Sequence, residues 1–148
     1  MDSLKFNDIC EKLKYDEKIS GILKVIGLSI DKNKHNETYV FSNNIEQYLG
    51  QDAYLEDIVF YFVDDRCLYR AIYDTNKQYV NINKKYLKNI VSVELNHKIY
   101  NNEVELSINF IDETIKISNL REDIKGKWLS KEFSEELYRV IIDTYSKI

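Results

Sequence analysis

The sequence predicts an α+β protein in which N-terminal helices precede an antiparallel sheet of six or seven strands and an amphipathic C-terminal helix caps that sheet. Apolar residues recur at helical spacing in residues 1–30 and again in 130–148, whereas they alternate with polar residues through most of 57–118. The links between the alternating segments are short, which favours an antiparallel meander over parallel crossovers. The length of 148 residues matches one domain, with the sheet expected within 38–120.

The first 50 residues predict helices, a loop and one short strand. Leu4, Ile9 and Leu13 suit a short first helix, and Gly27 suits the C-terminal end of a second. The polar, Asn-rich segment 30–37 is expected to be a loop, TYVFS a short strand, and NNIEQYLG a helical turn closed by Gly50. The apolar stripe of the second helix, at positions i, i+3, i+4 and i+7, consists of Ile19, Ile22, Leu23 and Ile26.

The segment DIVFYFVDDRCLYRAIYD, residues 57–74, predicts an antiparallel hairpin. Its first part, 58–63, is continuously apolar and indicates a buried strand, and the residues after Arg66 alternate. Asp64 and Asp65 both tolerate turn geometry and are expected to form the tight connection. Because the first strand is apolar on both faces, one face can pack on the core and the other needs a separate cover. The N-terminal helices are expected to provide it, with a binding partner as the alternative.

Four further segments predict strands: QYVNINK, NIVSVEL, VELSINFI and TIKIS. The alternation is cleanest in VELSINFI, where Glu105, Ser107 and Asn109 are expected to face outward. The inward-facing residues of the last three segments are expected to be Val91, Val93, Leu95, Val104, Leu106, Ile108, Phe110, Ile115 and Ile117.

Residues 130–148 predict one strongly amphipathic helix that packs on the sheet. Ser130 is the expected N-cap, and the pairs Glu135 with Arg139 and Asp143 with Lys147 have i, i+4 spacing. The apolar stripe is expected to contain Phe133, Leu137, Val140, Ile141, Tyr145 and Ile148.

The order of these elements, several antiparallel strands followed by one terminal amphipathic helix, resembles the pleckstrin-homology-like (PH-like) domains. NKKYLKNIVSVEL, residues 83–95, is similar to a strand entry of bacterial PH-like domains, and the resemblance covers about residues 57–148. It implies a bent, seven-stranded sheet that serves as a binding platform for proteins, peptides or lipid headgroups. Phosphoinositide-binding members have a basic loop between the first two strands. In this sequence the corresponding turn is Asp64-Asp65-Arg66, and its carboxylates would repel a phosphorylated headgroup.

The composition excludes several classes of function. A net charge of −4 argues against general nucleic-acid binding, which depends on Lys and Arg. No apolar run approaches the length of about 18 residues that a membrane span needs, and the N-terminus does not resemble a secretory signal, so a cytoplasmic location is expected. The two cysteines do not form a disulfide framework. Glycine-rich phosphate loops, HExxH, CxxC and GxSxG motifs are missing, and no cofactor is expected.

Two groups of residues are candidates for binding. Tyrosine is enriched in protein interfaces, so the hairpin residues Tyr61, Tyr69, Tyr73, Asp64 and Asp65 are candidates for contact with a protein; the alternative is that the tyrosines pack under the N-terminal helices. A second group, Lys84, Lys85 and Lys88, with Lys98 nearby, is the candidate for anion binding. The favoured interpretation of these lysines is a charged strand edge that opposes aggregation.

Metal binding and nucleophilic catalysis are both disfavoured. Asp64, Asp65 and Asp74 bracket the hairpin, with Glu56 and Asp57 before it, but their spacing is sparser than in hard-metal sites and indicates solvated turns. Nothing in the sequence brings His35 or His97 to a cysteine. The sequence therefore favours a non-enzymatic protein-binding module, by analogy a small inhibitor of the immunity-protein or phage counter-defence type. The alternative is recognition of a phosphate-bearing ligand, a lipid headgroup or a nucleotide, through the lysines.

Overall fold

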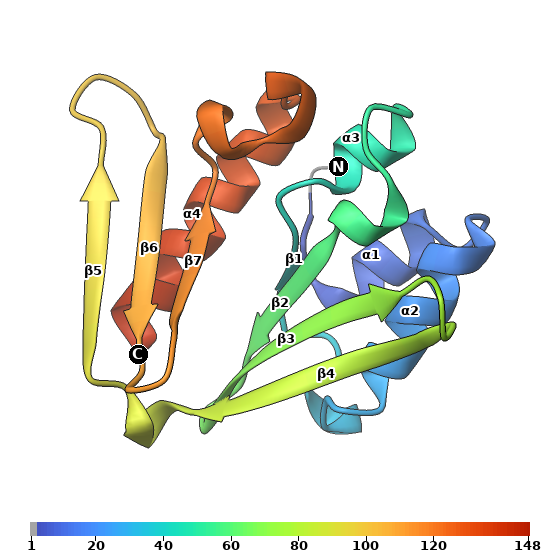
Figure 1. Ribbon diagram of the computed structural model, residues 1–148, viewed down its shortest axis with the longest axis horizontal. Helices are drawn as coiled ribbons and strands as arrows, with labels where there is room; N and C mark the ends of the chain where they lie inside the picture. The colour runs from blue at the N-terminus through green and yellow to red at the C-terminus, as the bar shows by residue number, and fades with distance from the viewer. Residues whose placement is uncertain (1–2) are drawn as a thin grey trace.

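The computed structural model describes residues 3–148 as an α+β fold with two antiparallel sheets and a C-terminal helix (Figure 1). The four-stranded sheet has the order β1-β2-β3-β4 and the three-stranded sheet the order β5-β6-β7. The strands are β1 (Val40–Phe41), β2 (Val59–Val63), β3 (Cys67–Asp74), β4 (Tyr79–Tyr86), β5 (Ser92–His97), β6 (Val104–Asn109) and β7 (Thr114–Ser118). Each predicted strand segment therefore contains a strand.

Within residues 3–148, four α-helices and five short 3-10 helices accompany the sheets. The α-helices are α1 (Phe6–Lys12), α2 (Glu17–Gly27), α3 (Ile45–Leu49) and α4 (Lys131–Lys147). The 3-10 helices are η1 (Lys32–Lys34), η2 (Leu55–Asp57), η3 (Leu87–Asn89), η4 (Arg121–Asp123) and η5 (Lys125–Lys127). The predicted apolar stripe of α2 is buried throughout. His35 Nε2 lies 3.1 Å from the carbonyl oxygens of both Gly27 and Ile30, so its ring closes the C-terminal end of α2.

The strands do not form one continuous meander, because the sheet is interrupted between β4 and β5. After Tyr86 it turns through η3, and β5 pairs with β6 instead of β4. The sheet expected as a single unit is therefore divided into four and three strands, and β4 and β5 each become an edge. Val91 lies just before β5 and is 64% exposed, so its expected inward position is wrong.

The central strand β6 follows the predicted alternation with one exception. Val104, Leu106 and Ile108 are fully buried. Ser107, expected to face outward, is only 6% exposed. It lies in the central strand, where it pairs with Glu94 on one side and Lys116 on the other.

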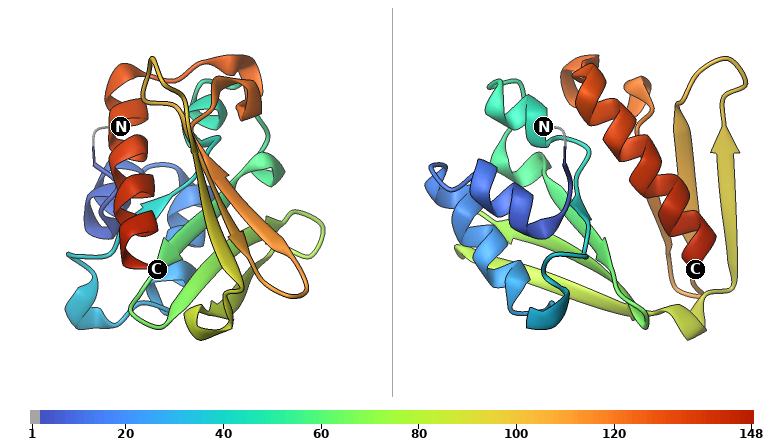
Figure 2. Two further views of the ribbon diagram at one scale, coloured as in Figure 1. Left: turned by 90° about the vertical axis from the view of Figure 1, so that its left-hand side faces the viewer. Right: turned by 180° about the vertical axis from the view of Figure 1, so that it is seen from behind.

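The two faces of the hairpin of β2 and β3 have different neighbours. Phe62 pairs with Tyr69, and both line a cavity together with Ser29 and Ile30, which follow α2. The views in Figures 1 and 2 agree that α1 and α2 lie over this face of the sheet. The opposite face, which carries Val63, borders the end of α4. Helices α1 and α2 therefore cover one face of the continuously apolar strand, as expected, whereas the half-buried opposite face lines a cavity beside α4.

Helix α4 packs on the three-stranded sheet through most of the predicted stripe (Figure 2). Tyr145 is 41% exposed, so its expected place in the stripe is wrong; Thr144 is buried there and donates a hydrogen bond to the Val140 carbonyl. Ser130 caps the helix as expected, accepting from the Phe133 amide at 3.2 Å. The stripe residues with at most 1% exposure are Phe133, Leu137, Val140 and Ile141.

A buried polar junction joins α3 to the start of α4. Glu46 is 8% exposed, and its carboxylate accepts from the Ser130 amide at 3.0 Å and from the Ser130 hydroxyl at 2.6 Å. Gln47, next to it, is fully buried and donates to the Trp128 carbonyl. Hydrogen bonds to an ionised carboxylate are stronger than bonds between neutral groups. These contacts therefore hold α3 against the start of α4.

Within residues 3–148, no helix combines the length and the hydrophobicity that a membrane crossing requires.

Candidate functional site

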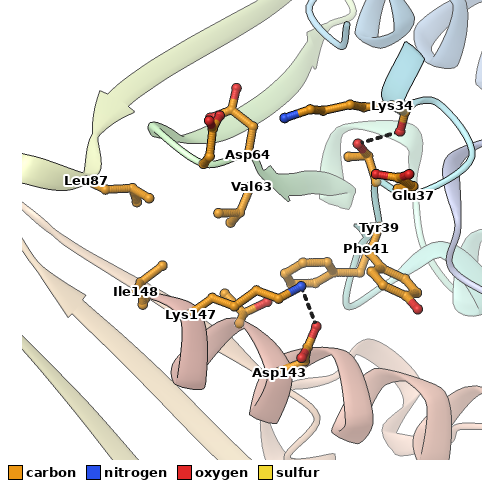
Figure 3. Close-up of a pocket in the computed structure, with 13 residues that line it drawn as sticks. Lys34, Glu37, Tyr39, Phe41, Val63, Asp64, Leu87, Asp143, Lys147 and Ile148 are labelled. Carbon is orange, nitrogen blue, oxygen red and sulfur yellow. Dashed lines mark hydrogen bonds and ion pairs between the residues drawn. The ribbon is translucent and has the colours of Figure 1, made fainter. Parts of the chain in front are cut away.

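Two cavities at the turn between β2 and β3 share part of their lining, and together we call them the turn hollow. Figure 3 shows the larger one. The larger has a volume of about 430 Å³ and the smaller about 230 Å³. Lys34, Thr38, Asp64 and Asp65 line both. Besides the turn, the walls come from the η1–β1 connection, η3 and the last turn of α4, segments that are far apart in the sequence.

The turn itself is organised by the Asp64 carboxylate. Its Oδ1 accepts from the amides of Arg66 at 2.8 Å and Cys67 at 2.7 Å, and its Oδ2 accepts from the Tyr69 hydroxyl at 2.7 Å. An Asp that bonds to amides two and three residues ahead replaces part of a backbone turn, which explains the tight connection without glycine. The predicted turn at Asp64 and Asp65 is confirmed.

These contacts shift the pKa of both partners. Burial acts to raise the pKa of Asp64, but the bonds from Tyr69, Arg66 and Cys67, with the charge of Lys34, outweigh it and lower this pKa overall. Burial raises the pKa of the Tyr69 phenol, and its bond to Asp64 raises it further. Asp64 therefore carries its negative charge permanently in the pH range of most cells.

The three candidate tyrosines do not share one face of the hairpin. Tyr69 is only 6% exposed, because its ring stacks on Phe62 with centroids 4.5 Å apart and planes at 3°. Tyr61 lies on the opposite face, paired with Arg70 and 6.0 Å from the Phe41 ring. Tyr73 lies at the far end of β3. Packing therefore accounts for most of the Tyr69 ring. Of the predicted protein-binding candidates, Asp64 and Asp65 line both cavities of the turn hollow and Tyr69 lines the smaller one.

The larger cavity combines an apolar floor with an excess of carboxylates. Asp143 and Lys147 form a closed pair at 2.9 Å on α4. The remaining charged side chains of the lining are Glu37, Asp64, Asp65 and Lys34, so three negative charges and one positive charge leave a net charge of −2. Within residues 3–148, neither Glu37 nor Asp65 has a side-chain hydrogen bond or ion pair.

The candidate lysines are divided between two environments. Lys85 pairs with Asp112 at 2.7 Å and with Glu113 at 3.2 Å, which links β4 to the turn between β6 and β7. The bond to Asp112 raises the pKa of Lys85 and lowers that of Asp112. Lys84 lies on the other face of β4, and its Nζ is 5.8 Å from the Tyr86 ring centroid. Lys88 Nζ lies at the same distance from that ring.

Lys98, expected near the other lysines, instead pairs with Glu103 at 3.6 Å across the start of the β5–β6 loop. Lys84 and Lys85 lie on β4, the edge strand of the four-stranded sheet. Their position agrees with the interpretation of a charged edge, because lysines on an edge strand discourage pairing with another chain.

Asp57 and Asp74, two of the acidic residues around the hairpin, have local partners. Asp57 accepts from the Tyr54 amide at 2.7 Å and lies 3.7 Å from Lys125, and Asp74 accepts from the amides of Asn76 and Lys77. In the part of the chain that the structure describes, no three His, Cys, Asp or Glu side chains are grouped as a metal site.

The histidines and cysteines do not form a nucleophilic pair in residues 3–148. His35 bonds to carbonyl oxygens of the α2 end, and His97 lies between the Lys98 carbonyl and the Tyr138 hydroxyl. Cys67 is buried within β3. Burial raises the pKa of the Cys10 thiol, which disfavours its thiolate.

The charged residues of the larger cavity outside the turn were not singled out as a site by the sequence; they are Lys34, Glu37, Asp143 and Lys147. Lys34 and Glu37 belong to a segment expected to be a polar loop, and the other two form the predicted i, i+4 pair on the outer side of α4. Local spacing carries no signal for their convergence, because more than 100 residues separate the two pairs along the chain.

Comparison of the chain with protein-family models, with curated proteins and with solved structures finds no match. The function proposed below therefore rests on the geometry of the turn hollow.

Proposed function

We propose that the protein is a non-enzymatic protein-binding module that contacts its partner at the turn hollow. The observation that carries the proposal is a concave site of about 430 Å³ whose floor is apolar and whose rim holds two carboxylates without partners in residues 3–148. Concave, largely apolar surfaces with a few polar groups are the usual form of binding sites. Rim charges mainly set the association rate and the choice of partner.

A PH-like arrangement is part of this proposal. Seven strands in sheets of four and three, followed by one amphipathic helix, support it, and TYVFS supplies the seventh strand as β1. Because β1 is the first strand, a different loop corresponds to the basic loop of phosphoinositide-binding members. The Asp64-Asp65-Arg66 turn joins β2 to β3, so the loop between the first two strands is instead 42–58, which contains α3. The expected repulsion at the Asp64 turn thus no longer bears on that loop.

The charge of the protein favours a basic partner. A net charge of −4 gives a long-range attraction that speeds association with a positively charged surface and weakens as salt is added. An inhibitory role of the immunity-protein or counter-defence type fits a small acidic protein whose site blocks a partner without chemistry of its own. We therefore expect the partner to be a basic protein, held in a salt-dependent complex.

The test compares two variants that fill the hollow with a matched control. Ile148→Trp and Leu87→Trp place a large side chain at the lining of the larger cavity, and Ile99→Trp adds the same side chain at a position that is 88% exposed in the β5–β6 loop. Each immobilised protein is incubated with lysate of the native host, the retained proteins are identified by mass spectrometry, and binding is repeated with the purified partner. Thermal unfolding of each variant controls for folding.

We expect a partner that the parent and Ile99→Trp retain equally and that both cavity-filling variants bind at least about tenfold more weakly, because filling a recognition pocket typically removes a hot-spot contact. Equal retention by all four proteins would place the partner elsewhere and contradict the proposal.

The alternative function, recognition of a phosphate-bearing ligand, is favoured by one observation. Lys84 and Lys88 form no ion pair within residues 3–148 and flank the Tyr86 ring. ATP and vesicles with an anionic lipid are suitable probes at low salt, with the triple change of Lys84, Lys85 and Lys88 to Gln as the variant. We expect binding to be the same in the parent and the variant. Binding that disappears only in the variant would support this alternative over a protein-binding module.

A further inference from the structure

The floor of the larger cavity is suited to a long aliphatic stem. Phe41 and Val63 lie on the face of the four-stranded sheet that borders α4, and Leu87 and Ile148 complete the apolar wall. Figure 3 shows these side chains around the open space between the sheet and the helix. Such a surface stabilises methylene groups, because apolar area removed from water contributes about 25 cal/mol per Å².

The rim above this floor is suited to a cation. Asp64 stays ionised because its pKa is lowered by the Tyr69 and amide bonds that outweigh burial. Asp65 and Glu37 add two exposed carboxylates that are not neutralised within residues 3–148. An apolar floor below an anionic rim complements lysine and arginine, which bury their stems and keep the charged head at the surface.

The chain itself provides a weak cationic neighbour for this rim. In Figure 3 the Lys34 side chain directs its ammonium group toward Asp64. The charge of Lys34 helps to lower the pKa of Asp64, yet Lys34 closes no ion pair with a carboxylate of residues 3–148. An exposed lysine on a three-residue 3-10 helix is easily displaced, so a partner's cation can take the position beside Asp64 and Asp65.

We infer that the larger cavity of the turn hollow receives a lysine or arginine side chain of the partner protein, with its stem on Phe41 and Val63 and its charge between Glu37, Asp64 and Asp65. This inference rests on the proposed function and names the chemistry of the partner at that site. A phosphate group is disfavoured at this place because the lining has a net charge of −2.

The test uses blocked single residues as probes in place of the partner. N-acetyl-arginine methylamide carries the cation and the stem, and N-acetyl-citrulline methylamide has nearly the same shape without the charge. Titration of each probe into ¹⁵N-labelled protein, followed by amide chemical shifts, gives the position and the affinity of binding. We expect saturable shifts with the arginine probe around the amides of Asp64, Asp65 and Leu87, and at least about threefold weaker binding of the citrulline probe.

Charge variants give the affinity a predicted order. Removing two rim charges with Glu37→Gln and Asp65→Asn should weaken the arginine probe about twofold to fivefold per charge, the range of exposed ion pairs. Lys34→Gln should strengthen it by a similar factor, because the competing cation is lost. The matched control, Glu94→Gln with Glu122→Gln, removes the same two charges at exposed positions outside the cavity lining. It should change the affinity by less than the rim variant does.

The results separate this inference from the proposed function. Equal affinities of the two probes, no localised shifts, or weaker binding by Lys34→Gln would each overturn the basic-residue assignment. If the partner identified with the cavity-filling variants binds the rim-charge variant as tightly as the parent, protein binding at the turn hollow stands and the inference fails. If the cavity-filling variants keep the partner while the arginine probe still binds, the proposed function fails, and the cavity then binds a basic side chain that does not come from this partner.

Discussion

Replacing Tyr69 by Phe tests how the Asp64 turn is stabilised. The change keeps the ring that stacks on Phe62 at 4.5 Å and removes only the hydroxyl that donates to Asp64 Oδ2 at 2.7 Å. A hydrogen bond to a charged group contributes about 1.5–3 kcal/mol. Asp64 is partly exposed, so water takes over part of this contact and we expect a loss of about 1 kcal/mol in the free energy of unfolding.

The same change has a predictable dependence on pH. The folded-state pKa of Asp64 is lowered, so the stabilisation is present above the ordinary carboxyl pKa of about 3.9 and is lost as the pH falls through the lower folded pKa. The difference between parent and Tyr69→Phe should therefore be constant above about pH 5 and should shrink toward lower pH. The carboxyl resonance of Asp64 should titrate at a higher pH in the variant, because a bond that favours the charged form is gone.

Urea denaturation at several pH values measures both effects, and Tyr145→Phe is the matched control. Tyr145 is 41% exposed, and its hydroxyl makes no hydrogen bond within residues 3–148. The control should lose less than about 0.3 kcal/mol, as substitutions at such surface positions usually do. A loss in Tyr69→Phe no larger than in the control, or one that does not change between pH 5 and pH 3, would refute the role given to this bond.

Three further predictions concern the scaffold. Leu137→Ala removes a fully buried side chain from α4 and should cost about 2–5 kcal/mol in urea denaturation, against less than about 0.5 kcal/mol for Tyr145→Ala; similar losses at both positions would mean that the stripe is misplaced. Glu46→Gln replaces the ionised acceptor of two Ser130 bonds and should cost about 1–3 kcal/mol, whereas an unchanged unfolding midpoint would show that the junction adds no stability. Deleting 1–30 removes α1 and α2, so the remaining fragment should aggregate or bind a hydrophobic dye, and a monomeric fragment with cooperative unfolding would disprove that these helices cover the hairpin.

The identity and the extent of most elements follow from local sequence. Three features show this: the i, i+3, i+4, i+7 stripe of α2, the alternation in β6 and the Ser130 cap. Each depends only on residues of the same helix or strand. The tight turn at Asp64 is also local, because its carboxylate bonds to amides two and three residues ahead. Periodicity and side-chain chemistry therefore decide which segments become helices, strands and turns.

Tertiary structure decides what periodicity does not describe. The division into two sheets at η3 depends on whether β5 pairs with β6 or with β4. Both pairings are compatible with the same alternating pattern. Tyr145 and Thr144 are adjacent in sequence, and only the packing of α4 on its sheet selects which of them is buried.

The turn hollow is the clearest case of a feature that depends on the tertiary structure. Its rim joins Glu37, Asp64, Asp65 and the end of α4, which a linear pattern cannot bring together. The sequence by itself determined the residue types, the acidic balance and the Asp64 turn. The packing of α4 beside the four-stranded sheet brings these residues to one apolar floor. Only the tertiary structure decides this, because electrostatic interaction depends on distance in space and not on separation along the chain.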